Sequence, residues 1–272
     1  MSGDGDSEIK FSFNFFKKNT IIILLVLIIL FGLYLRFYHV DYPVVGYHNW
    51  KETHYLTEAR NFAENGFFAN GFFVPEFDYP DYGHNPSGVH SDSFPIISII
   101  VGFLFMIFGS SLALARLVGI SFSIGTIFIM YLLSTKLFKN KWMALIVAFL
   151  TALSPLFVFF SHNVQLMNIG VFFMVTSLYF FASWIKEDRA KLLYLASLFF
   201  TLAALTKYSF GIAIVPMLFM VPKSRYKKLK KYTKQLIYSV LIFLPFVFWV
   251  IYSEFFIAKQ AGASAITRSL FD

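Results

Sequence analysis

The sequence predicts an all-α, polytopic membrane protein: a bundle of about seven membrane-spanning helices with one long loop on the extracytoplasmic side. Three observations predict this class. Of the 272 residues, 58% are hydrophobic, 21% are aromatic and only 14% are charged. The apolar residues form long runs, and Lys and Arg cluster beside those runs. Soluble globular domains rarely combine so much apolar sequence with so little charge.

The first apolar run, Thr20–Tyr38, is about as long as a helix that crosses a bilayer. No small-residue cleavage site follows it, so we interpret it as a retained span rather than a signal peptide. Residues 1–19 carry Lys17 and Lys18 next to this span. We predict that they form a short, flexible cytoplasmic tail.

Seven further apolar runs follow the first one. They are Phe94–Phe108, Leu112–Leu133, Trp142–Phe160, Ile169–Ile185, Leu192–Leu205, Ser209–Val221 and Leu236–Phe256. If all of them crossed, with the N-terminus in the cytoplasm, thirteen bases in the clusters at 136–141, 186–191 and 223–234 would lie outside. Short cytoplasmic loops normally hold the excess of Lys and Arg. The run at 94–108 rises only about 22 Å as a helix, short of a roughly 30 Å hydrocarbon core. We therefore predict that it dips into the outer interface, which returns all thirteen bases to the cytoplasm.

The predicted organisation is a cytoplasmic tail at 1–19, a transmembrane module at 20–256 and an extracytoplasmic C-terminal tail at 257–272. The extracytoplasmic loop, about 39–111, holds juxtamembrane helices. We expect a multi-pass protein of the cell membrane with a cytoplasmic N-terminus.

Titratable residues concentrate in the extracytoplasmic loop. Between His39 and Ser93 there are eight acids, two bases and five of the six histidines, and the sixth, His162, is predicted on the same side. Within the loop, the spacing of apolar residues predicts an amphipathic helix over Lys51–Asn65, ended by Gly66. Its pattern places Glu52 on the face that packs on the membrane domain and turns Glu58 and Asn61 towards solvent.

Three residues are candidates for catalysis or anion binding. Glu52, in a partly apolar setting, suits a general base, although a carboxylate at a helix start can also only complement the macrodipole. Lys207 lies in the "TKYS" junction of two short apolar runs, where an ionisable residue at membrane depth indicates a functional site or a side chain that snorkels to the headgroups. Arg116 opens a span, as an interface anchor or as a fixed cation for a phosphate.

The residue types present exclude some classes of cofactor and partner and leave others open. Because there is no Cys, thiolate catalysis and cysteine-ligated metals are excluded. His48, Glu52 and His54 are ordinary ligand types at short spacing, so a divalent metal is an open alternative, but they match no closed metal motif. The net charge of +8 comes from bases beside apolar runs, where they set topology and contact anionic membrane lipids. We predict no nucleic-acid binding.

Five segments in this order resemble membrane glycosyltransferases of the GT-C class, on the branch of protein mannosyltransferases and aminoarabinose transferase-like enzymes. The segments are "LRFYHVDYP", "KETHYLTEARNF", "SFPIISIIVGFLFMIFGSSLALARL", "SPLFVFFSHNVQLMN" and "LAALTKYSFGIAIVP". The resemblance runs from about Leu33 to Pro222. It implies a polyprenyl-phosphate-linked sugar as donor, an active site on the extracytoplasmic side, and a protein, glycan or lipid as acceptor.

The resemblance also implies roles for individual residues. Relatives begin the outer helix with an Asp-Glu pair whose Asp is the expected base, and this chain has Lys51 and Glu52 there. Glu52 is therefore the implied base of an inverting displacement, with Lys207 and Arg116 as partners of the leaving phosphate. The residues implied near the substrate also include Lys51, His54, His90 and Asp92.

Two alternatives to an enzyme remain open at this stage. A transporter or channel normally carries charges inside its spans or a repeat-related second half, and neither pattern is present. A non-catalytic lipid-binding protein is consistent with the same sequence, because Lys51 replaces the acid that relatives use.

Overall fold

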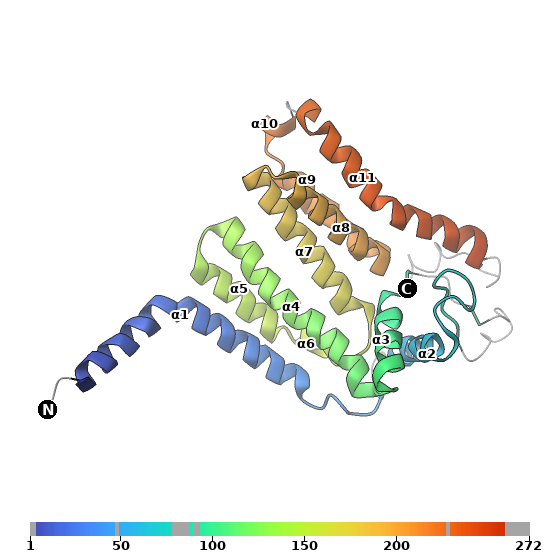
Figure 1. The fold of residues 1–272 in the computed structure, drawn as a ribbon, viewed down its shortest axis with the longest axis horizontal. Helices are drawn as coiled ribbons and strands as arrows, with labels where there is room; N and C mark the ends of the chain where they lie inside the picture. The colour runs from blue at the N-terminus through green and yellow to red at the C-terminus, as the bar shows by residue number, and fades with distance from the viewer. Residues whose placement is uncertain (1–3, 47–48, 78–87, 90–92, 227–228, 259–272) are drawn as a thin grey trace.

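The computed structural model describes residues 4–46, 49–77, 88–89, 93–226 and 229–258, and in these ranges it is helical apart from loops and one isolated bridge between Glu76 and Val89. Figure 1 shows helices from α1 to α11 side by side, with α2 and α3 across one end. The predicted all-α class is confirmed. The long helices are α1 (Asp4–Phe37), α4 (Leu112–Phe138), α7 (Leu166–Glu187) and α11 (Leu229–Tyr252).

The remaining elements are shorter. They are α2 (Asn49–Asn65), α3 (Ile96–Phe108), α5 (Lys141–Leu153), α6 (Pro155–Ser161), α8 (Ala190–Thr206), the 3₁₀-helix η1 (Tyr208–Ala213), α9 (Ile214–Met220), α10 (Lys223–Tyr226) and the π-helical turn η2 (Ser253–Ile257).

Four of the described helices are long and apolar enough to cross a membrane, and the bent pair α5–α6 makes a fifth. This is fewer than the seven spans that we predicted, because α8 and the segment Tyr208–Met220 are apolar but shorter than a full crossing. The helix α1 begins at Asp4, so residues 4–19 are helical and continuous with the first span. The predicted cytoplasmic location of the tail at 1–19 stays a prediction.

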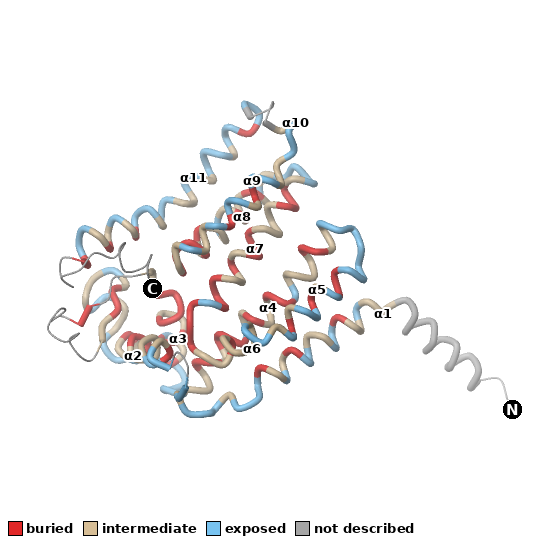
Figure 2. Tube along the Cα trace, turned by 180° about the vertical axis from the view of Figure 1, so that it is seen from behind, coloured by how far each residue is buried: buried red, intermediate tan, exposed pale blue. Residues whose placement is uncertain are grey.

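The helices pack in the order α1, α5, α4, α7, α8 and α11, with α4 against both α5 and α7 and with α8 between α7 and α11. In Figure 2 the buried segments lie mainly on the inner helices and on α2 and α3, whereas α11 is largely exposed. The exposed side chains of α11 include Ile237, Val240 and Phe248. An apolar outer surface of this kind fits lipid rather than water.

Local sequence explains where these helices begin and break. Asn140 caps α5, since its side chain accepts hydrogen bonds from the backbone N–H groups of Trp142 and Met143. Pro155 follows Ser154, whose backbone is not helical, with φ of −52° and ψ of 114°, and the axes of α5 and α6 differ there by 56°. A residue before proline disfavours the helical conformation, so the predicted single run at Trp142–Phe160 is a broken helix.

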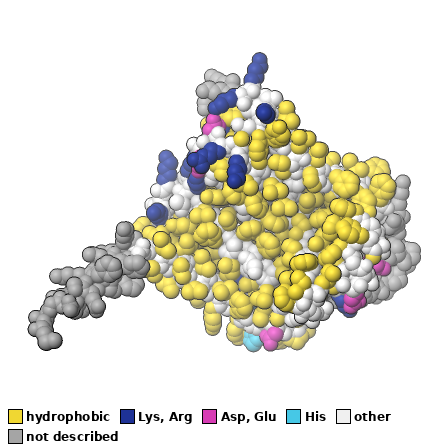
Figure 3. All heavy atoms as spheres, viewed as in Figure 1, with side chains coloured by type: hydrophobic (Ala, Val, Ile, Leu, Met, Phe, Trp, Pro, Cys, Tyr) yellow, Lys and Arg dark blue, Asp and Glu magenta, His cyan; other side chains and the backbone are white. Residues whose placement is uncertain are grey.

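The three basic clusters meet at one end of the bundle. Lys136 at the end of α4 pairs with Glu187 at the end of α7, and both Arg225 and Lys231 pair with Asp188. Figure 3 shows the Lys and Arg side chains gathered at this end, beyond a continuous hydrophobic face. The described members of the three clusters thus lie at one end of the bundle, and their predicted location in the cytoplasm stays a prediction.

The opposite end is closed by α2, α3 and the loops around them. The N–H of Phe94 donates to the carbonyl of Leu205 at 3.1 Å, and the N–H of Phe72 donates to the hydroxyl of Tyr252 at 3.0 Å. These bonds tie the segments between α2 and α3 to the ends of α8 and α11. We call this end, formed by α2, α3 and the adjoining helix termini, the closed end.

Gly102 permits the close contact of α3 with α2, because a Cβ at this position would lie 2.9 Å from the carbonyl oxygen of Ala59. We predict that Gly102→Ala lowers the free energy of unfolding by about 1–3 kcal/mol, as expected for overpacking. Thermal unfolding of the purified protein in lipid nanodiscs measures this. Gly211→Ala is the matched control, since its added Cβ meets no atom within 4 Å. Equal stability of the two variants would contradict the packing of α2 on α3.

Candidate functional site

The helix α2 presents one face to the bundle, as the spacing of its apolar residues predicts. Ala59 and Phe62 are buried on that face together with Glu52, and a second acid of α2, Glu58, is buried as well. The helix ends at Asn65, and Gly66 follows with a positive φ of 87°, a conformation that favours glycine. Two carboxylates are thus carried into the interior of the closed end.

Glu52 forms a two-point ion pair with Arg116. Its oxygens accept from Nε of Arg116 at 2.8 Å and from a terminal guanidinium nitrogen at 3.0 Å. One oxygen also accepts from the N–H of Val164 at 3.1 Å. Arg116 in addition donates to the carbonyls of Val40 and Tyr42. Glu52 is only 1% exposed and Arg116 only 4%, so the pair is shielded from water.

This pair joins four segments of the chain: the connection after α1, the first turn of α2, the start of α4 and the turn between α6 and α7. A buried charge is stabilised only when it is paired and hydrogen-bonded, and each charge here depends on the other. The observed contacts therefore give Glu52 and Arg116 a role in positioning α2. Their predicted roles as base and phosphate partner stay predictions.

A pocket of about 290 Å³ lies at the junction of α2, the turn before α7 and the break after α8. Its lining includes Lys51, the sequence neighbour of Glu52. Its lining residues are Lys51, Tyr55, Phe160, Gln165, Leu166, Met167, Lys207, Ser209 and Phe210. We call it the lysine pocket. Its lining includes two lysines and, among the residues that the structure describes, no carboxylate.

The two lysines reach this pocket from different elements. Lys51 lies in the first turn of α2, four residues before Tyr55 on the same face. Lys207 follows α8, and its extended backbone, with φ of −160° and ψ of 136°, separates α8 from η1. The predicted junction at Lys207 is confirmed, and its side chain lines a cavity at the closed end. The sequence predicts that Lys51 and Lys207 lie on the same side of the membrane, but it does not predict that they line one pocket.

Gln165 is a pocket residue that the sequence did not single out for binding. It is 5% exposed and precedes α7, and its side-chain Nε2 has no hydrogen-bond partner among the residues that the structure describes. A buried amide that lacks a partner loses several hydrogen bonds to water without replacement. Its position beside two lysines indicates a pocket suited to an anionic ligand with oxygen acceptors.

Phe210 forms one wall of the lysine pocket, and Gly170 of α7 explains how the ring fits. A Cβ added at position 170 would overlap the Phe210 ring. The absence of a side chain at Gly170 thus lets η1 approach α7 closely, which brings Ser209 and Lys207 to the pocket.

A second buried group surrounds Glu58, and here the sequence prediction was wrong. Glu58 was expected to face solvent but is 1% exposed, because α3 packs over this side of α2. The hydroxyl of Ser98 donates to one oxygen of Glu58, and Nε2 of His54 lies 3.0 Å from the other. Asn61 is likewise half-buried and donates to the carbonyl of Glu76 at 2.8 Å. His54 is therefore held by Glu58, outside the set of residues that line the lysine pocket.

His162 is a further titratable group of the closed end, in the turn between α6 and α7. Burial lowers the pKa of its imidazole below the ordinary value, and the neighbouring cations Arg116 and Arg36 lower it further. A hydrogen bond between Nε2 and the carbonyl of Leu35, at 3.1 Å, opposes this shift. The net lowering favours the neutral ring, which is positioned by the end of α1.

The predicted metal site lies partly outside the described residues. His48, like the predicted substrate residues His90 and Asp92, lies outside the described residues. Among the described residues there is no group of three His, Asp or Glu side chains that could hold a metal ion. Glu52 and His54, the two described members of the predicted set, have different partners, Arg116 and Glu58.

The structure thus combines an apolar helical bundle with cations and a buried carboxylate–arginine pair at one end. The comparison with known families identifies the class, which is that of membrane glycosyltransferases of the GT-C type. The family model described as dolichyl-phosphate-mannose-protein mannosyltransferase matches residues 90–252, which is more than half of the chain. The chain belongs to this family. No curated protein and no solved structure gave a match to it.

The matched region contains Arg116, Gln165 and Lys207, whereas α2 with Lys51 and Glu52 precedes it. The family thus supports a mannosyltransferase-type glycosyltransferase in a membrane.

We predict that Arg116→Met lowers the free energy of unfolding by about 3–5 kcal/mol, because it leaves the carboxylate of Glu52 buried without its partner. The double variant Glu52→Gln/Arg116→Met should recover part of this loss. Denaturant or thermal unfolding in detergent measures each variant of the cycle. Arg189→Met, at a side chain 76% exposed, is the control and should change stability by no more than about 0.5 kcal/mol. Strictly additive effects of the two substitutions would contradict the pairing.

Proposed function

We propose that this protein transfers a sugar from a polyprenyl-phosphate donor to a protein, glycan or lipid acceptor on the extracytoplasmic side of the cell membrane. The lysine pocket at the closed end carries the proposal, because it offers two cations and an unpartnered amide to an anion beside a membrane bundle. Membership of the mannosyltransferase family supports the reaction type and the donor class.

In the proposed reaction the acceptor hydroxyl attacks the anomeric carbon from the face opposite to the phosphate. A new carbon–oxygen bond forms, the bond between the anomeric carbon and the phosphate oxygen breaks, and its electron pair leaves with the phosphate. The acceptor proton goes to a carboxylate, for which we propose Glu52. Lys207 and Arg116 would stabilise the charge that develops on the leaving phosphate.

The contacts of Glu52 set a condition on this mechanism. Both of its oxygens accept hydrogen bonds from Arg116, so opening one of these bonds would make the carboxylate more accessible to the acceptor hydroxyl. An anionic donor in the neighbouring pocket competes with Glu52 for Arg116. We propose that donor binding turns Arg116 towards the phosphate and thereby frees the carboxylate. Lys51, His54, His90 and Asp92 remain proposed substrate contacts.

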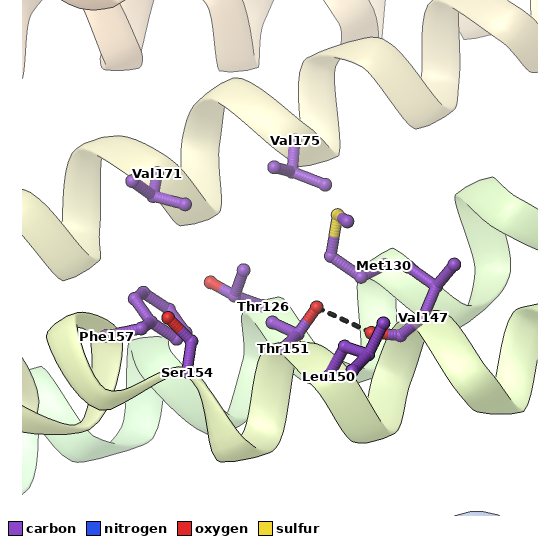
Figure 4. Close-up of a pocket in the computed structure, with 9 residues that line it drawn as sticks. All are labelled: Thr126, Met130, Val147, Leu150, Thr151, Ser154, Phe157, Val171 and Val175. Carbon is purple, nitrogen blue, oxygen red and sulfur yellow. Dashed lines mark hydrogen bonds between the residues drawn. The ribbon is translucent and has the colours of Figure 1, made fainter.

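An apolar groove supports a donor with a lipid tail. It has a volume of about 430 Å³ and is lined by Thr126, Met130, Val147, Leu150, Thr151, Ser154, Phe157, Val171 and Val175. Figure 4 shows Val171 and Val175 of α7 facing Thr126, Met130 and Thr151 across this groove. Leu150 is 61% exposed, so the groove is open at the bundle surface.

The groove and the lysine pocket follow one another along α7. Met167 lines the pocket, and Val171 and Val175, four and eight residues later, line the groove on the same helix face. On α6, Phe160 likewise lines the pocket and Phe157 lines the groove. A phosphate in the pocket would therefore direct its prenyl chain along α7 into the apolar groove.

The proposed topology has seven crossings, with the N-terminus and the basic end in the cytoplasm. Beyond the four long helices, the bent pair α5–α6, the short helix α8 and the segment η1–α9 would complete the count. The transmembrane module then spans 20–256, and the closed end lies outside, as does the C-terminal tail at 257–272. The excess of Lys and Arg at the opposite end supports this orientation.

A second candidate function is binding of a polyprenyl phosphate without sugar transfer. Two observations favour it: Lys51 occupies the position where relatives carry the acid, and the carboxylate of Glu52 is already paired with Arg116. The two functions share the lysine pocket, and only turnover distinguishes them.

We predict that the purified protein in nanodiscs consumes a polyprenyl-phosphate sugar from a panel of such donors, and that Lys207→Ala lowers the rate about 10- to 100-fold through loss of phosphate stabilisation. Lys207→Arg should retain more activity, because the cation is kept. Lys191→Ala, an exposed lysine at the basic end, should match the parent protein. Donor binding with no consumption by the parent would establish the binding function in place of the enzyme.

Glu52→Gln tests the base. Transfer should fall by about 10²–10⁴-fold if Glu52 takes the acceptor proton, while donor affinity should not fall, because the neutral side chain competes less for Arg116. Transfer at the parent rate by a folded Glu52→Gln protein would rule out the base assignment and leave Glu52 as a positioning residue.

Because the protein has no Cys, single cysteines can report topology without background. We predict that cysteines at Phe68, which is 63% exposed at the closed end, and at Arg189 react with a membrane-impermeant maleimide from opposite sides. In intact cells only the Phe68→Cys variant should be labelled. Labelling of Arg189→Cys alone would reverse the proposed orientation.

A further inference from the structure

We propose that His162 is a positioning residue of the transfer reaction, which holds the turn between α6 and α7 so that the N–H of Val164 orients the carboxylate of Glu52. The inference rests on the proposed function, since it concerns the base of that reaction. It is carried by hydrogen bonds that lead from the end of α1 through this turn to α2.

The contact between the turn and Glu52 is the first step. Its Oε1 accepts from Nε of Arg116 and from the N–H of Val164, the latter at 3.1 Å, whereas its Oε2 accepts from a terminal guanidinium nitrogen. In the proposed reaction Arg116 turns towards the donor phosphate and frees Oε2 for the acceptor proton. The bond from Val164 still holds Oε1 at that moment, so the position of the turn sets the orientation of the base.

The attachment of the turn to α1 is the second step. Nε2 of His162 lies 3.1 Å from the carbonyl oxygen of Leu35 in the last turn of α1. The last carbonyls of a helix have no partner within the helix, and a nearby His can donate to one of them. Because a carbonyl oxygen only accepts, Nε2 carries the proton in this bond. Val164 follows two residues later, so the bond is a short tether between α1 and the N–H that Glu52 accepts.

The end of α1 is a firm anchor for this tether, because Arg36 fixes it to two other helices. Arg36 is fully buried, and its guanidinium donates to Oγ of Ser123 in α4 at 2.7 Å and to the carbonyl of Ala152 in α5 at 3.1 Å. The bond of His162 therefore ends on a part of the bundle that three helices hold together. A misplacement of about 1 Å near the reacting groups can cost about 100-fold in rate, so a base depends on support of this kind.

The electrostatic surroundings of His162 favour the neutral ring that the tether uses. Among the described residues, the cations beside it are Arg116 of α4 and Arg36 of α1, and the acid paired with Arg116 is Glu52 of α2. Burial lowers the pKa of the imidazole most, the bond to Leu35 opposes this shift, and the two cations lower the pKa further. Protonation would add a third positive charge beside the two arginines. The ring protonated only at Nε2 is therefore the state that supports the turn.

The experiment replaces His162 with Met, which has no donor, and with Gln, whose Nε2 can donate from a similar position. Transfer from the polyprenyl-phosphate sugar that the parent protein consumes is measured in nanodiscs, below the unfolding temperature of every variant. We expect His162→Met to lower kcat about 10- to 100-fold and His162→Gln to stay within about threefold of the parent. His39→Asn is the control, at an exposed histidine of the closed end whose positive φ Asn tolerates, and it should match the parent.

A double-mutant cycle separates positioning from a general loss of structure. In the Glu52→Gln protein, which lacks the base, His162→Met should change the residual transfer by less than about twofold, because His162 acts through that carboxylate. Magic-angle-spinning NMR of protein with ¹⁵N-labelled histidine reads the tether itself. At pH 6.5, the ordinary pKa of an imidazole, a signal from a neutral ring protonated at Nε2 should be present and should disappear in His162→Gln.

Each outcome supports or overturns the inference. Transfer at the parent rate by His162→Met, or no recovery in His162→Gln, overturns the positioning role and leaves the proposed function intact. An equal loss with and without the carboxylate of Glu52 also overturns it, because the effect of His162 would then be structural. A His162 ring that is not protonated at Nε2 removes the tether. If the parent protein consumes no donor, the proposed function itself fails, and the role of His162 in it fails as well.

Discussion

The buried ion pair between Glu52 and Arg116 is the interaction on which the closed end depends. Arg116 donates to both oxygens of Glu52 and to two carbonyls of the connection after α1, and Glu52 also accepts from the turn before α7. These contacts fix α2 against the membrane helices. Because Lys51 precedes Glu52 directly and Gln165 follows Val164 directly, the same pair sets the position of two residues of the lysine pocket.

The fold distributes charge between its two ends in different ways. At the basic end, the exposed lysines and arginines share the acids Glu187 and Asp188, and partners of this kind contribute little to stability. At the closed end, the two buried acids among the described residues each have a specific partner, Glu52 with Arg116 and Glu58 with His54. Lys51 and Lys207 line a cavity at this end, and the proposed chemistry lies there.

Several parts of this architecture could be predicted from the sequence. Hydropathy predicts the helical class, and the positions of the bases predict that the basic loops lie together. Both features follow from how a chain is inserted into a membrane and not from side-chain packing. The spacing of apolar residues likewise predicts α2 and the burial of Glu52. The junction at Lys207, which separates two short helices, was also predicted, whereas the bend before Pro155 was not.

Other parts depend on packing that a sequence pattern does not contain. The helical periodicity of α2 predicts that Glu58 faces solvent. In the structure α3 packs over that side and buries Glu58 against Ser98. Arg116 could be recognised as a cation near the outer surface, but its partner lies 64 residues away in the chain and could not be deduced. Gln165 gives no sequence signal for binding, and only its burial without a partner in the lysine pocket reveals it.

The central claim is that the donor phosphate binds between Lys51 and Lys207 at the closed end. Magic-angle-spinning NMR of protein with ¹⁵N-labelled lysine, reconstituted with a phosphorylated prenyl lipid, measures dipolar contacts between phosphorus and each lysine Nζ, with Lys51→Met and Lys207→Met for assignment. The account predicts phosphorus contacts that disappear in these two variants. Contacts that persist in both, and arise only from the lysines of the basic end, would contradict it.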